Sequence, residues 1–294
     1  MRRKSVWATL LCLAVVAIIT VVAAPASAVV GGQQDTDNQY SNVGMNLQHV
    51  EGEYGFAGTC TLIKNDRKGA VVVTAAHCLW GETSEWIAQH FVVTFDPLED
   101  HDWFMSVPDL EGVKTYKVTA AAMYPGFDFV FVGNSAPSYL VQNDVGLMWL
   151  DGPVYVPGTR TLVAPAPIVG PGALDRLDLK RETFTLVGYG VSDMLAGNVT
   201  SFEAGGFAAP VWNGRNYKDV SVNTEDGQFA DRYLSLTAGM YVWDSGGAVF
   251  HGKTLVGVSA NCTTATSPFD AFRLDSPLAQ QFLSSYGLVP KPPQ

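Results

Sequence analysis

Short apolar runs alternate with polar, turn-forming stretches along most of the chain. The runs cover residues 71–75, 91–95, 145–150, 184–191, 248–250 and 255–259. Gly, Pro, Asn and Asp separate them, and this pattern is typical of β-strands joined by turns. Helical periodicity is confined to the C-terminal region, where Ser276 and Pro277 precede the apolar residues Phe282 and Leu283. The pattern therefore predicts an all-β protein that ends in a short helix.

The N-terminal region has the layout of a secretory signal peptide. Basic residues at 2–4 precede an apolar run over 6–24, and Ala26 and Ala28 then supply the small residues of a cleavage site. We expect residues 1–28 to be removed on export. The alternative is a membrane anchor, because a run of this length could span a bilayer.

Composition and charge exclude several classes of protein. Only 16% of the 294 residues are charged, against about 25% in an average soluble chain, which excludes intrinsic disorder. The net charge is −10, and removing three basic residues with the signal peptide makes it −13. Phosphate binding needs clustered Lys and Arg, so we expect no nucleic-acid partner.

Three short stretches carry candidate chemistry. They place His77, Asp144 and Ser245 in that order, 67 and 101 residues apart. A serine hydroxyl is a weak nucleophile that needs a neighbouring base, and the base needs a partner that fixes its tautomer. Ser245 would attack, His77 would take and return the proton, and Asp144 would orient the imidazole. The alternatives are a turn serine, a buried structural histidine, and Asp128 in place of Asp144.

These residues and their surroundings resemble the chymotrypsin-like (trypsin-like) serine peptidases. The landmarks, which span residues 29 to about 285, are Val29-Val30-Gly31-Gly32, Thr74-Ala75-Ala76-His77-Cys78, Tyr124-Pro125-Gly126-Phe127, Gly188-Tyr189-Gly190, Trp243-Asp244-Ser245-Gly246-Gly247 and Leu255-Val256-Gly257-Val258-Ser259. The resemblance implies two six-stranded antiparallel β-barrels, over about 29–155 and about 156–294. The active site would lie in the cleft between them.

The resemblance also implies roles for residues around the nucleophile. The backbone N–H groups of Trp243 and Ser245 would form the oxyanion hole. The α-amino group of Val29, freed by signal cleavage, would pair with Asp244 and shape the site without a separate propeptide. Trp243 departs from the family, which usually has Gly at this position, and this departure is the main threat to activity.

Other implied features concern the cysteines and the substrate pocket. Cys60 and Cys78 match a family disulfide, whereas Cys262 is expected to be unpaired. Gly239 and Ser259 match substrate-binding positions. No acid occupies Gly239, so specificity for Lys or Arg is disfavoured, because those side chains need a buried carboxylate.

The sequence therefore predicts a secreted, monomeric serine endopeptidase that works through an acyl-enzyme intermediate. We expect protein or peptide substrates, protein inhibitors, no cofactor and no metal ion. After signal cleavage we expect no membrane association. The alternative is a protease-fold binding protein with weak or no catalysis. The His77, Asp144 and Ser245 set favours the enzyme, and Trp243 favours the alternative.

Overall fold

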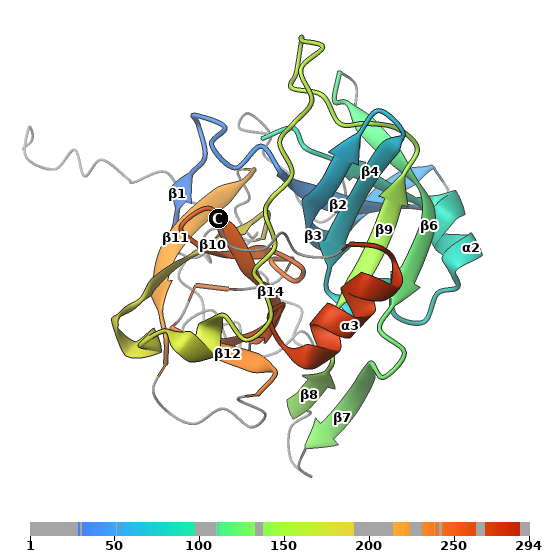
Figure 1. The fold of residues 1–294 in the computed structure, drawn as a ribbon. Helices are drawn as coiled ribbons and strands as arrows, with labels where there is room; N and C mark the ends of the chain where they lie inside the picture. The colour runs from blue at the N-terminus through green and yellow to red at the C-terminus, as the bar shows by residue number, and fades with distance from the viewer. Residues whose placement is uncertain are drawn as a thin grey trace, which may run out of the picture.

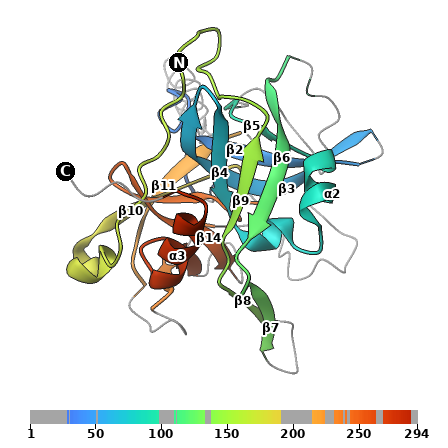
Figure 2. The same ribbon diagram turned by 45° about the vertical axis from the view of Figure 1, so that its right-hand side comes forward.

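Strands make up most of the computed structural model, and they form two units that lie side by side (Figure 1 and Figure 2). The structure describes residues 29, 31–50, 52–97, 110, 112–132, 138–190, 214–223, 231–237, 239–240, 243–262 and 268–288. The expected signal peptide, residues 1–28, lies outside this part of the chain. No helix in the described ranges is long and apolar enough to cross a membrane.

The first unit is a closed antiparallel barrel of six strands. In barrel order the strands are β2 (Val43–Val50), β3 (Glu53–Asp66), β4 (Gly69–Thr74), β9 (Gly146–Leu150), β6 (Thr115–Met123) and β5 (Phe91–Thr94). A hairpin made of β7 (Asp128–Val132) and β8 (Ser138–Gln142) projects from the barrel (Figure 2). The barrel has no free edge, so its backbone hydrogen bonds are satisfied internally.

Strand β4 shows why the run at 71–75 is continuously apolar rather than alternating. Val71 and Val73 belong to a hydrophobic cluster that also contains Leu186 of the second unit, whereas Val72 belongs to a separate cluster. Successive side chains of a strand point to opposite faces. Both faces of β4 are therefore buried, and the strand connects the two hydrophobic cores.

The second unit is an antiparallel sheet of seven strands. Its order is β1 (Gln33–Gln34), β11 (Asn216–Ser221), β10 (Thr183–Gly188), β13 (Ala248–His251), β14 (Thr254–Cys262), β15 (Phe269–Arg273) and β12 (Tyr233–Leu236). An isolated bridge between Val222 and Leu236 brings β12 back towards β11. The sheet therefore curls into a second, incompletely closed barrel of six strands, which β1 extends at one edge. Strand β1 carries the N-terminal segment across to this second unit.

The C-terminal helix α3 (Pro277–Ser285) begins as the sequence predicts. The Ser276 hydroxyl accepts the backbone N–H of Ala279 at 3.3 Å, and Pro277 occupies the first turn. Phe282 is buried and makes an edge contact with Tyr124 of the first unit, with ring centroids 5.7 Å apart. The helix thus packs across the junction of the two units (Figure 1).

The expected fold class is confirmed, and every predicted strand run overlaps a strand of the structure. Helix α2 (Ser84–His90) was not predicted. Its N-terminus is capped by the Thr83 hydroxyl, which accepts the Trp86 N–H at 3.1 Å. The remaining short elements are the 3₁₀ helices η1 (Ala76–Leu79), η2 (Leu174–Arg176) and η3 (Leu179–Arg181).

Candidate active site

His77 lies where the first barrel turns from strand β4 into the 3₁₀ helix η1. Gly146 lets this turn pack tightly on β9, because a Cβ at Gly146 would come within 2.9 Å of Leu79 Cδ1. The His77 side chain is 20% exposed, so the imidazole can meet both a buried partner and a molecule arriving from solvent.

His77 and Asp144 meet at two points. Nδ1 of the imidazole lies 2.7 Å from Asp144 Oδ2, and the backbone N–H of His77 donates to Asp144 Oδ1 at 2.8 Å. Burial by itself lowers the pKa of the His77 imidazole, but the charge of the fully buried Asp144, with Cys78 adding to it, raises that pKa well above its usual value. Because this contact occupies Nδ1, a proton transfer between His77 and a nucleophile would have to use Nε2.

A tight turn at Asn143 presents Asp144. Asn143 has a φ of 55°, which asparagine tolerates better than most residues. Its side-chain amide donates to the Gly126 carbonyl at 2.7 Å, and its Oδ1 accepts from Arg232 at 3.3 Å. The competing residue Asp128 is exposed at the start of β7.

Ser245 comes from the second unit, in the segment 243–247, here called the nucleophile loop. Its carbonyl accepts the Thr59 N–H at 2.8 Å and the Cys78 thiol at 3.6 Å. Gly246 has a φ of 83°, and a Cβ there would overlap the Thr59 carbonyl. The loop is therefore pressed against the first barrel, beside the residue that follows His77. The Ser245 side chain is partly exposed.

Thr59 of strand β3 is a fully buried link between the two units. Its hydroxyl donates to the Trp243 carbonyl at 3.0 Å and accepts the Tyr189 N–H at 3.1 Å. Trp243 has a φ of 73°, a left-handed conformation that a bulky residue adopts only under local constraint. The backbone at this position thus has the conformation that glycine favours, although the residue is tryptophan.

Asp244 is fully buried beside the Gly-Tyr-Gly turn. Its Oδ1 accepts the Gly190 N–H at 2.9 Å, and a Cβ at Gly188 or Gly190 would overlap its carboxylate. Val29 is also fully buried, and its carbonyl accepts the Gly32 N–H at 2.6 Å. The ion pair between the α-amino group of Val29 and Asp244 stays a prediction.

The two expected substrate-binding residues differ in their surroundings. A Cβ at Gly239 would lie 3.2 Å from Lys218 Cδ and 3.5 Å from Val29 Cγ1, so this position faces the N-terminal segment. Ser259 is fully buried, and its hydroxyl donates to the Asp244 carbonyl. Its N–H and carbonyl bond the nucleophile loop at Gly247 and Gly246. Ser259 thus supports the loop, and its contact with substrate stays a prediction.

Cys60 and Cys78 are free thiols in the structure, so the expected disulfide is not formed there. Cys60 is fully buried, and burial, with a contribution from nearby Cys78, raises the pKa of its thiol well above the usual value. A Cβ at Gly58, two residues before Cys60, would lie 2.8 Å from Cys78 Sγ, and the pairing of the two cysteines stays a prediction. The Cys262 side chain lies outside the described part of the structure.

Some contributors to the site were not predicted from the sequence. Thr59 and Tyr233 are the clearest examples: Tyr233 is buried, and its pKa is raised by burial and then by the charge of Asp144. A polar residue inside a strand is the one signal that could have drawn attention to Thr59. Among the described residues, no group of three or more His, Cys, Asp or Glu side chains is placed to hold a metal ion.

No protein-family model matches the sequence, and no curated protein matches it. Solved structures do match. Human heparin binding protein aligns with a TM-score of 0.59 and 17% identity, over 90% of this chain and 100% of that chain. The granzyme GrC aligns with a TM-score of 0.60 and 15% identity, over 88% and 99% of the two chains. These are chymotrypsin-fold proteins, so this chain has the chymotrypsin fold.

Proposed function

We propose that the protein is a secreted serine endopeptidase that hydrolyses peptide bonds through an acyl-enzyme intermediate. The observation that carries the proposal is the two-point contact between His77 and Asp144, with the Ser245 backbone bonded to Cys78 beside it. A histidine held through Nδ1 by a buried carboxylate is the arrangement that a serine nucleophile requires.

In this mechanism the Ser245 hydroxyl attacks the substrate carbonyl while Nε2 of His77 takes its proton. The charged imidazole is stabilised by Asp144, which already raises its pKa. The tetrahedral intermediate collapses when His77 gives the proton to the leaving amine. Water then attacks the acyl-enzyme by the same route, and Ser245 is released.

The negatively charged oxygen of the tetrahedral intermediate would accept hydrogen bonds from the backbone N–H groups of Trp243 and Ser245. Hydrogen bonds from Thr59 hold the carbonyls of both residues, and this supports a loop that is ordered before substrate arrives. Preordered donors are effective because the protein need not reorganise as charge develops.

Labelling with a fluorophosphonate probe tests this function. The probe should modify Ser245 in the purified protein, the Ser245→Ala variant should be unlabelled, and the protein should cleave unstructured protein substrates. Asp144→Asn is the second variant to test, because it leaves the Ser245 hydroxyl in place. We still expect its rate of peptide-bond cleavage to fall about 10⁴-fold. Labelling that is unaffected by Ser245→Ala overturns the proposal.

The second candidate is a binding protein built on this fold. The φ of 73° at Trp243 favours it, because a bulky residue stands where the oxyanion hole would form. One structural neighbour is itself named for binding heparin. The net charge of −10 argues against a polyanionic ligand for this chain. A folded protein with no Ser245-dependent labelling would support this candidate, with a partner other than a polyanion.

A further inference from the structure

A fully buried ion pair joins the N-terminal segment to the second unit. Nε of Arg215 lies 2.7 Å from Asp35 Oδ2, and both side chains have no exposed surface. The carboxylate also accepts the backbone N–H groups of Gln39 and Tyr40, at 2.8 and 3.0 Å. The cost of removing both charges from water offsets most of the attraction in a buried ion pair. We therefore looked for a role of this pair other than stabilising the fold.

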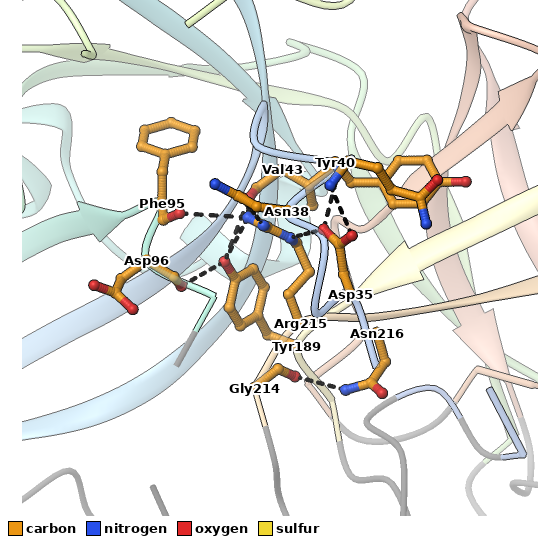
Figure 3. Close-up of polar contacts among 11 residues, drawn as sticks. Asp35, Asn38, Tyr40, Val43, Phe95, Asp96, Tyr189, Gly214, Arg215 and Asn216 are labelled. Carbon is orange, nitrogen blue, oxygen red and sulfur yellow. Dashed lines mark hydrogen bonds and ion pairs between the residues drawn. The ribbon is translucent and has the colours of Figure 1, made fainter. Parts of the chain in front are cut away.

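Arg215 contacts the first barrel as well (Figure 3). Its Nη1 donates to the carbonyls of Val43, at 3.0 Å, and Phe95, at 3.3 Å, and its Nη2 donates to Asn38 Oδ1. Its backbone N–H donates to the Pro97 carbonyl at 2.9 Å. One side chain therefore fixes the N-terminal segment, β2 and the end of β5 relative to one another.

The same guanidinium leads to the nucleophile loop through Tyr189. Nη1 of Arg215 donates to the Tyr189 hydroxyl at 3.2 Å, and that hydroxyl donates to the Asp96 carbonyl at 2.8 Å. At the other end of the residue, the Tyr189 N–H donates to Thr59 Oγ1, which itself donates to the Trp243 carbonyl. Arg215 thus holds the hydroxyl of Tyr189, and the Thr59 hydroxyl, which also bonds Trp243 in the nucleophile loop, holds its backbone N–H.

A second path of hydrogen bonds from the Tyr189 turn to the nucleophile loop starts at Gly190. The Gly190 N–H donates to Asp244 Oδ1 at 2.9 Å, so the turn that contains Tyr189 also holds the residue before Ser245. The hydrogen bonds of the two paths are 2.9 to 3.2 Å long, and Thr59, Tyr189, Gly190 and Asp244 are buried. A shift of Tyr189 would therefore displace Trp243 and Asp244 together.

We propose that Arg215 is a positioning residue for the nucleophile loop, acting through Tyr189 on Trp243 and Asp244. The effect on catalysis rests on the proposed function, whereas the effect on the order of the loop does not. The Asp35–Arg215 pair consists of internal side chains, so this support is present in the uncut chain, before any new N-terminus is formed at Val29.

Two variants test the proposal. Tyr189→Phe removes the hydroxyl and keeps the ring, so it breaks the contact with Arg215 and leaves the backbone bonds of the turn. Arg215→Met removes the charge and keeps most of the volume. The matched control is Arg273→Met, because Arg273 is also a buried arginine, 3.0 Å from Asp275 and 2.5 Å from Asp175, in a cluster at the start of α3.

The primary measurement is backbone hydrogen exchange of the peptide that covers residues 243–247. Exchange reports local opening in the folded protein and needs no catalysis. We expect it to quicken at least about tenfold in Tyr189→Phe and to stay within about twofold of wild type in Arg273→Met. Unchanged exchange in Tyr189→Phe, or the same quickening in Arg273→Met, overturns the proposal. Tyr189→Phe decides the matter where Arg215→Met fails to fold.

The second measurement is the fluorophosphonate reaction, corrected for the folded fraction. We expect the maximal inactivation rate to fall about tenfold in Tyr189→Phe with half-saturation unchanged, because misplaced groups slow the reaction step more than binding. A protein that is never labelled removes the proposed function, and the exchange measurement then decides the present proposal by itself.

Discussion

The hydroxyl of Thr59, in the first barrel, donates a hydrogen bond to the carbonyl of Trp243, in the second unit, over 3.0 Å. The same oxygen accepts the Tyr189 N–H, so one buried hydroxyl satisfies two backbone groups from distant parts of the chain. Removing a hydrogen-bond partner from a buried polar group costs about 1–3 kcal/mol. This contact therefore stabilises the junction of the two units as well as the loop that carries Ser245.

Thr59→Val should destabilise the protein by about 3 kcal/mol, because it keeps the shape of the side chain and removes both bonds. Urea unfolding measures the change. The control is Thr61→Val in the same strand, since Thr61 Oγ1 is buried and has no hydrogen-bond partner among the described residues. We expect that control to change stability by less than about 0.5 kcal/mol, or to increase it. Equal losses in the two variants would contradict the role assigned to Thr59.

At position 243 the usual stability order of glycine and alanine should be reversed. Both substitutions remove the indole, but only alanine keeps a Cβ in the left-handed conformation observed at a φ of 73°. Trp243→Gly should therefore be more stable than Trp243→Ala by about 1–2 kcal/mol. Thermal unfolding of the pair measures this, and an alanine variant as stable as the glycine variant refutes it.

The pH profile of fluorophosphonate labelling should report the raised pKa of His77. Only the neutral imidazole accepts a proton, so the labelling rate should rise with pH as His77 loses its charge. The midpoint of this rise should lie above the usual histidine pKa of about 6.5. In Asp144→Asn the midpoint should move to lower pH as the maximal rate falls. A midpoint that does not move would show that Asp144 leaves the charge of His77 unaffected.

The same shift predicts a contribution of His77 to folding stability. Because the folded-state pKa lies above the unfolded value, the contribution is fully present below about pH 6.5 and is lost as pH rises through the folded pKa. His77→Gln removes the titrating group. Unfolding of wild type and His77→Gln across this range should show a difference in stability that shrinks with rising pH, and a constant difference contradicts the assignment.

The exported protein should contain one disulfide, between Cys60 and Cys78. Cys78 Sγ packs against Gly58, two residues before Cys60, and a bridge closing a loop of this length stabilises a protein by about 3 kcal/mol. Alkylation of the unfolded protein without reductant, read by mass spectrometry, should leave these two cysteines unmodified and modify Cys262. Modification of all three would show that the bridge is absent.

The N-terminus of the active protein should be Val29. The pKa of a free α-amino group is near 8, and pairing with Asp244 should raise it. Activity should therefore decline only when the pH exceeds this raised pKa, where the α-amino group loses its charge. N-terminal sequencing of the secreted protein tests the assignment directly. Any other start would mean that activation follows a different route.

The sequence revealed the parts of the molecule that local pattern determines. The apolar run of β4, the capped start of α3 and the strand after Asp144 are all visible in a few consecutive residues. Helix α2 was missed because its main signal is a single cap, at Thr83, and the seven residues of Ser84–His90 are too few to show clear periodicity.

The contacts that organise the candidate site were not predictable in the same way. Asp35 and Arg215 are separated by 180 positions, and no local motif pairs them. Thr59 reads as an ordinary strand residue until Trp243 and Tyr189 are seen on either side of its hydroxyl. The addition of β1 to the second sheet is also a tertiary effect, since two residues, Gln33–Gln34, carry no strand signal of their own.

Strand β4 divides its side chains between two hydrophobic clusters, and this division couples the unfolding of the two units. Separating the halves would leave Val71 and Val73 facing water on one side of an otherwise intact barrel. This exposure couples the folding of the two units, so heating should melt both in one cooperative event.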